Sequence, residues 1–100
     1  MAVVKDYYSR IGRGDLAGAW ALRWPSPRGD EAAFIAAYAR YDRHEATVGA
    51  PSRVASSAGH DYVEVPVHLY GTMKDGKVFS SAGTVSLRRK AGGAWRIYPN

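Results

Sequence analysis

Apolar side chains in the first part of the chain recur at the three- and four-residue spacing of a helix. In the segment Ala2–Ile11, polar residues separate four such side chains, which are Val4, Tyr7, Tyr8 and Ile11. Residues at this spacing share one helix face, so the pattern predicts an amphipathic helix. Gly12 and Gly14 follow and predict its end, because glycine is favoured just beyond the last helical turn.

Two further helices are predicted before Asp42. Asp15 can accept the free backbone amides at the start of the second helix, and Pro25 ends it. The apolar positions of that helix are Leu16, Ala19, Trp20 and Trp24. Asp30 is the equivalent cap of the third helix. Glu31, in its first turn, places a negative charge near the positive end of the helix dipole, which is favourable. The apolar face of the third helix is predicted to be Phe34, Ile35, Tyr38 and Tyr41.

After Asp42 the apolar spacing changes from helical to alternating, and recurrent turn residues leave room for five strands. In the clearest strand, Tyr62–Gly71, alternate residues point to opposite faces. The predicted core face is Val63, Val65, Val67 and Leu69. The opposite face is Tyr62, Glu64, Pro66, His68 and Tyr70.

The two remaining long segments complete a predicted antiparallel sheet. Asp75 and Gly76 are typical of a hairpin turn into a strand over Val78–Arg89, in which Gly83 predicts a bulge or bend. The inward candidates of this strand are Phe79, Val85 and Leu87. A final strand over Ala94–Tyr98 places two more side chains on the core side, which are Trp95 and Ile97.

Composition narrows the class of protein without identifying an activity. A chain of 100 residues with 46% hydrophobic residues fits a single domain, 1–100, with one core. Its 14 Lys and Arg against 9 Asp and Glu give a net charge of +5, but the cations are scattered, which disfavours nucleic acid as a partner. No apolar run approaches the roughly 18 residues of a membrane span, and without cysteine the compartment stays undetermined.

Several local motifs resemble those of the NTF2-like superfamily, the cone-shaped proteins named for nuclear transport factor 2. They are Val4-Lys5-Asp6-Tyr7-Tyr8, Gly14-Asp15, Ala19-Trp20 and the closing Gly93-Ala94-Trp95-Arg96-Ile97. The resemblance implies an α+β fold in which three N-terminal helices pack on the concave face of a curved antiparallel sheet. It also implies a cavity that different members use for isomerisation, dehydration, hydrolysis, ligand binding or packing, and many members are small dimers.

His44 is the best candidate for chemistry inside such a cone. It shares a predicted strand face with Ala46 and Val48, and Tyr38 and Tyr41 precede it on the third helix. Burial can tune an imidazole for general-base work, although a plain core histidine bonded to a tyrosine fits the same pattern. Asp42, two residues earlier, is either a partner of His44 or a turn residue.

An aromatic pocket is a second hypothesis. Its predicted lining, suited to a flat apolar ligand, is Tyr7, Trp20, Trp24, Phe34, Tyr38 and Trp95. The same rings could instead fill the core.

The outer face of the clearest strand predicts a dimer contact, because aromatic residues are enriched at interfaces. The residues concerned are Tyr62, Glu64, His68 and Tyr70. Glu64 and His68 lack a third ligand, so no metal site is expected, and no motif indicates a cofactor. The sequence thus favours a non-catalytic binding or accessory module that self-associates through its sheet. The alternative is a small enzyme or hydrophobic-ligand carrier with His44 as base or anchor.

Overall fold

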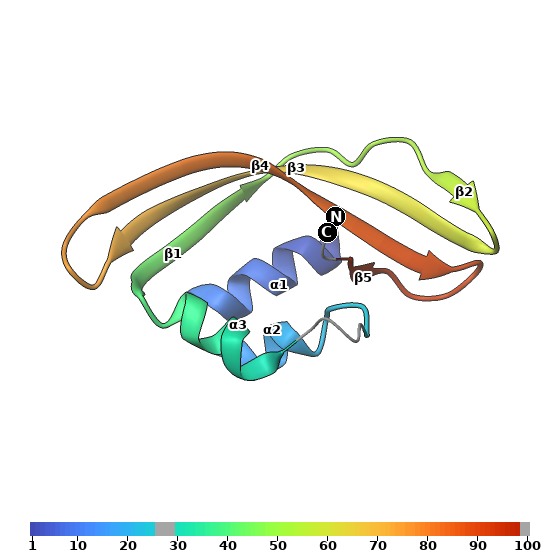
Figure 1. The fold of residues 1–100 in the computed structure, drawn as a ribbon. Coiled ribbons are helices and arrows are strands. Elements are labelled where there is room, and N and C mark those ends of the chain that lie inside the picture. Colours follow the sequence, from blue (N-terminus) through green and yellow to red (C-terminus); the bar gives the residue numbers. More distant parts are fainter. Residues whose placement is uncertain (26–29, 99–100) are drawn as a thin grey trace.

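Three helices precede a five-stranded sheet in this protein, as Figure 1 shows. The structure is a computed structural model that describes residues 1–25 and 30–98. The elements are α1 (Ala2–Gly12), α2 (Leu16–Trp20), α3 (Glu31–Tyr38), β1 (Tyr41–Val48), β2 (Ala55–Ser57), β3 (His60–Met73), β4 (Val78–Lys90) and β5 (Arg96–Ile97). The predicted α+β order of helices followed by strands is confirmed.

The helices begin where the sequence predicts. The Asp15 carboxylate accepts a hydrogen bond from the Gly18 amide at 3.0 Å, and that of Asp30 accepts one from the Ala32 amide at 3.0 Å. Each cap satisfies a backbone donor that a helix leaves free at its start. All four apolar residues predicted for the face of α1 are buried, so this helix is amphipathic as expected.

The sheet is antiparallel and strongly curled, forming a half-barrel whose strand order is β1-β3-β4-β5, with β2 also paired to β3. β3 and β4 pair without interruption from His60 opposite Lys90 to Thr72 opposite Val78. Gly83 lies within this unbroken register, so of the bulge or bend predicted there the bulge is absent. The register shift occurs in β1 instead, between Tyr41 and Arg43.

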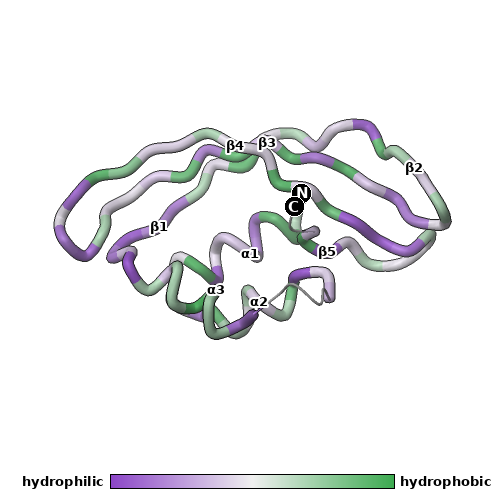
Figure 2. Tube along the Cα trace, viewed as in Figure 1, coloured by the Kyte–Doolittle hydropathy of each residue, from purple (hydrophilic) through white to green (hydrophobic). Residues whose placement is uncertain are grey.

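The helices lie against the concave face of the curved sheet (Figure 1). Hydrophobic and hydrophilic residues alternate along β3, as Figure 2 shows, and the buried apolar residues of β3 and β4 belong to one core cluster with those of α1. The buried residues of the sheet are Val63, Val65, Val67, Leu87 and Ile97. This confirms the predicted core face of β3 and the inward positions of Leu87 and Ile97.

Several element boundaries differ from the prediction, and the final strand, expected over Ala94–Tyr98, spans only Arg96–Ile97. Two further differences concern the helices. α3 ends at Tyr38, and Tyr41 is the first residue of β1 rather than the last apolar residue of the helix. Trp24 is not helical either, because its N–H donates to the Ile97 carbonyl at 2.6 Å, beside a bridge between Arg23 and Ile97. In both places pairing with a distant strand outweighs the local helical spacing. No local sequence pattern encodes such pairing.

A substitution at Leu87 tests this assignment of the core, because Leu87 is fully buried with 0% exposure. Leu87→Ala should lower the free energy of unfolding by about 2–5 kcal/mol, because it leaves a cavity on the concave face. Val54→Ala is the matched control, as Val54 is 53% exposed and its truncation should change stability by less than about 0.5 kcal/mol. Urea titration of both variants measures the difference, and equal costs would contradict this assignment of the core.

Candidate functional site

The start of β1 is shaped by two glycines that let other backbone segments approach it. Gly71 lies in β3, directly opposite His44 of β1. A Cβ atom on Gly71 would overlap the Arg43 carbonyl oxygen. A Cβ atom on Gly12, at the end of α1, would lie 2.8 Å from the His44 carbonyl oxygen. α1 therefore ends directly against β1, and the His44 side chain is enclosed between helix and sheet.

His44 lies in a cage of four aromatic rings and is only 5% exposed. The Tyr8 ring stacks parallel to the imidazole at a centroid distance of 6.0 Å. Tyr41 and Tyr38 approach it edge-on at 5.0 and 5.5 Å, and Phe79 lies at 5.5 Å. The rings come from α1, α3, β1 and β4, so only the folded chain brings them together.

The surroundings of His44 favour its neutral imidazole and leave one ring nitrogen without a described hydrogen-bond partner. Burial lowers the pKa of His44 below its ordinary value, because the charged form loses its hydration. Nδ1 is buried and has no hydrogen-bond partner in the described part of the chain. With the proton on Nε2, this nitrogen is a buried acceptor that no described group satisfies.

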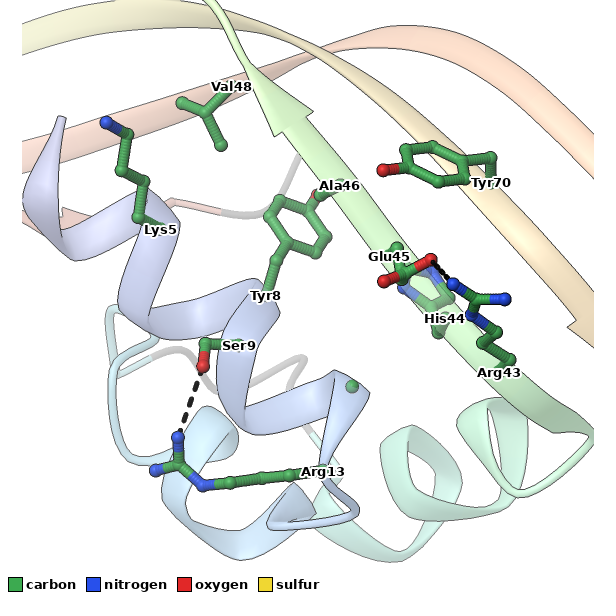
Figure 3. A pocket seen from close by; sticks show the side chains of 11 residues that line it. Lys5, Tyr8, Ser9, Arg13, Arg43, His44, Glu45, Ala46, Val48 and Tyr70 are labelled. Atoms are coloured by element: carbon green, nitrogen blue, oxygen red, sulfur yellow. Dashed lines mark hydrogen bonds and ion pairs between the residues drawn. The ribbon is translucent and has the colours of Figure 1, made fainter.

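Two hollows meet at His44 and Gly12. The larger one, of about 520 Å³, lies between α1 and β1 and is the one drawn in Figure 3. Its rim is polar, with an ion pair between Arg43 and Glu45 at 2.8 Å and a hydrogen bond from Arg13 to the Ser9 hydroxyl at 3.2 Å. These contacts leave Lys5 as the rim cation with no ion pair among the described residues.

The smaller hollow, of about 280 Å³, is lined by the end of α1, the turn before β1 and the β3–β4 hairpin. We call it the inner hollow; besides His44 its lining includes Gly12, Tyr38, Tyr41, Asp42 and Lys74. The turn and the hairpin are held together by a hydrogen bond from the Lys74 amide to the Arg40 carbonyl at 2.9 Å. Asp42 and Lys74 therefore border a space whose other lining residues are largely aromatic and apolar.

The structure gathers the four residues that the sequence offered for chemistry, His44, Tyr38, Tyr41 and Asp42, around this inner hollow. Their roles stay predictions, because position alone does not assign a reaction. Burial raises the pKa of the Tyr38 phenol, as it raises that of Tyr7.

Sequence reasoning gave no site role to Gly12, Lys74 or Phe79. The sequence predicts that Gly12 ends a helix and that Phe79 is an inward residue of its strand, and Lys74 directly precedes the turn residues Asp75 and Gly76. No local signal distinguishes a turn lysine that borders a hollow from one that faces solvent. The described residues also contain no cluster of three potential metal ligands.

The six aromatic residues predicted to line one pocket are divided by the fold. Tyr7, Trp20 and Tyr38 pack around Phe34, with centroid distances of 6.3, 5.3 and 5.0 Å. Their rings fill the space between the helices, and among them only Tyr38 also borders the inner hollow.

The other two rings of that set contact arginines elsewhere. Arg88 lies 4.8 Å from the Trp24 ring, and Arg89 lies 4.4 Å from the Trp95 ring. Trp24 is separated from the other rings because it follows Arg23, which bridges to Ile97 in an extended segment. Successive side chains of an extended segment point to opposite faces.

The predicted dimer residues lie along the outer face of β3. Tyr62 is half-buried beneath Arg88, whereas Glu64 and His68 are exposed and Tyr70 is 37% exposed. His68 Nε2 lies 2.6 Å from the Ser80 hydroxyl, and its ring stacks on Tyr70 at 5.5 Å. Three of the four side chains are accessible, and their role in self-association stays a prediction.

The fold of this chain is that of the NTF2-like proteins, as solved structures show. Aln2 from a Streptomyces species superposes with a TM-score of 0.68 at 17% identity, covering 96% of this chain and 80% of that one. A protein from Streptomyces avermitilis, named as a putative dehydratase of the NTF2-like family, has a TM-score of 0.64 at 12% identity, covering 99% and 91%. A ketosteroid isomerase-like protein from Erwinia carotovora atroseptica has a TM-score of 0.61 at 19% identity, covering 96% and 85%.

Sequence comparison adds no closer relationship. No protein-family model matches the chain, and no curated protein matches it. Among the described residues, no helix is long and apolar enough to cross a membrane. The comparisons therefore show the fold and leave the ligand or reaction to be argued from the site.

The buried neutral state of His44 makes stability depend on pH. Because its pKa is lower in the folded than in the unfolded chain, the unfolded chain binds the proton first as pH falls below about 6.5. The free energy of unfolding should therefore fall between pH 7 and pH 5, and His44→Phe should weaken that fall. Urea titrations at several pH values measure the slope.

His68→Phe is the matched control, since it removes an exposed histidine and should keep the slope. The carboxylate of Asp61 does not interfere, because hydrogen bonds from Ser56 and Arg89 lower its pKa and place its effect below about pH 4. An unchanged slope in His44→Phe would show that His44 is not the responsible group.

Proposed function

We propose that this chain is an NTF2-like binding module whose ligand enters the inner hollow and is anchored by His44. The observation that carries the proposal is the buried Nδ1 of His44, which has no partner in the described chain. A buried acceptor without a partner costs about 1–3 kcal/mol, so a ligand that donates to it recovers that energy.

The surroundings of His44 indicate the class of ligand. Aromatic rings on several sides favour a flat, largely apolar molecule, and the neutral imidazole favours one with a hydroxyl or N–H donor. Asp42 and Lys74 at the border of the hollow can bond a second polar group. A small phenol or hydroxylated ring has this combination of properties.

A second candidate function is proton transfer by His44. It is favoured by the shared lining, since Asp42 borders the same hollow as the histidine and Tyr41 offers a hydroxyl. A neutral buried imidazole is suited to accept a proton near pH 7. The solved neighbours named as a dehydratase and as ketosteroid isomerase-like make such chemistry compatible with the fold. Binding is preferred because neither the carboxylate of Asp42 nor any other acid is hydrogen-bonded to His44 among the described residues.

We further propose that the module self-associates through its sheet. The exposed outer face of β3 supports this, because Tyr70 and His68 already form a stacked pair there. A contact that holds side chains in place before association loses less conformational entropy on binding.

Phenol and anisole form a matched pair of probes for the site. Phenol can donate to Nδ1 of His44, whereas its methyl ether anisole has the same ring and no donor. We expect phenol to bind roughly fivefold more tightly, because one hydrogen bond contributes about 1 kcal/mol. NMR chemical-shift titration gives both affinities and shows whether Tyr41 and Lys74 shift with His44.

His44→Phe is the control, and it should abolish the preference for phenol while retaining the fold. His44→Asn separates the two candidate functions, because its amide oxygen accepts a hydrogen bond but is not a base. Retention of the phenol preference in His44→Asn supports an anchor. Equal affinities for phenol and anisole in the unmodified chain would contradict the proposal.

A further inference from the structure

One half of β4 has a free edge. β5 pairs with only two residues of β4, Leu87 and Arg88, and Tyr98 adds a hydrogen bond from its N–H to the Ser86 carbonyl at 2.8 Å. From Val78 to Thr84, β4 is paired with β3 on one side and with no described residue on the other. Such an edge presents backbone donors and acceptors that another strand can bind.

The register identifies which backbone groups are free. In an antiparallel strand the N–H and C=O of one residue point to the same side, and successive residues alternate. The Ser86 carbonyl points toward β5, while the Lys77 carbonyl points toward β3, where it accepts from the Met73 amide at 2.8 Å. By this alternation the residues directed to the free edge are Val78, Ser80, Ala82 and Thr84.

This edge lacks the features that usually protect exposed strands. The segment Val78–Leu87 contains no charged residue and no proline, and its pairing with β3 contains no bulge. Val78, at its start, is 80% exposed. Soluble proteins usually place lysine, proline or a bulge on a long free edge, so an unprotected edge favours a strand partner.

We propose that β4 of a second copy of this chain occupies the edge, antiparallel, with the two-fold axis at Ser81. The four free residues are symmetric about Ser81, so Val78 of one copy pairs with Thr84 of the other, and Ser80 with Ala82. Each of the four resulting pairs exchanges two hydrogen bonds, about eight in all, and satisfies every free group of the edge. This inference rests on the proposed self-association, but it places the contact at the edge of β4 and not on the outer face of β3.

The side chains are complementary in the same register. On the concave face Phe79 lies opposite Gly83 of the partner, and a Cβ atom at Gly83 would have no neighbour within 4 Å. An aromatic ring beside a strand glycine restores contacts that the glycine lacks. On the other face Val78 lies opposite Thr84, a pairing of β-branched residues.

Electrostatics also permits a second copy at this edge. The net charge of +5 would oppose association of two identical surfaces if the cations lay within the contact. None of the residues that pair in this register is charged. Association through this edge therefore brings no like charges directly opposite each other.

A symmetric cysteine tests the axis directly. Ser81 would face its own copy in a non-hydrogen-bonded pair, with Cα atoms about 4.5 Å apart, within the range that a disulfide spans. Because the chain has no cysteine, Ser81→Cys introduces a single thiol. Under mild oxidation it should form a disulfide-linked dimer at least tenfold faster than the control Ser80→Cys, whose thiol lies on the other face and opposite Ala82. Equal rates in the two variants would overturn the axis.

Sedimentation without cross-linking separates this contact from the outer face of β3. Ala82→Pro removes an N–H that points away from β3, so it should keep the fold, measured by circular dichroism, and weaken the dimer at least tenfold. His68→Asp alters the outer face and should leave the dimer intact. A dimer lost in His68→Asp and kept in Ala82→Pro overturns the edge contact alone. An unmodified chain that stays monomeric at millimolar concentration overturns self-association as well.

Discussion

The structure depends on the continuous pairing of β3 with β4. Thirteen consecutive residue pairs keep a single register, so every second side chain of both strands reaches the concave face. That face supplies most of the buried sheet residues, and α1 packs its four buried side chains against it. If one of the two strands slipped by one residue, its buried side chains would move to the solvent face. The burial of these strand side chains therefore specifies the register.

The candidate site follows from how closely α1 approaches the sheet. Gly12 and Gly71 remove two Cβ atoms that would otherwise hold the neighbouring backbone away from β1. The resulting contact buries His44 without giving its Nδ1 a partner. A core histidine that served only packing would be expected to have its polar atoms satisfied, since buried polar groups almost always are. The unsatisfied atom is therefore the feature that most favours a ligand.

The same two strands also determine which surfaces of the sheet are exposed. β4 is longer than the short β5 beside it, so half of its length keeps an exposed edge. On the outer face, the Arg88 guanidinium lies over the rings of Trp24 and Tyr62, so these three side chains form one cluster. The inner hollow is formed on the concave side with α1, whereas the free edge is on the opposite margin of the sheet from β1.

The sequence by itself determined the order of the elements, the buried face of α1, the caps at Asp15 and Asp30 and the core face of β3. These features depend on residues near each other in the chain, whose spacing follows the period of a helix or a strand. The tertiary structure alone decided that Tyr41 begins a strand, that the predicted aromatic pocket is divided, and that β4 keeps a free edge. Each of these depends on which distant segment pairs with which, and local periodicity does not encode the partner of a strand.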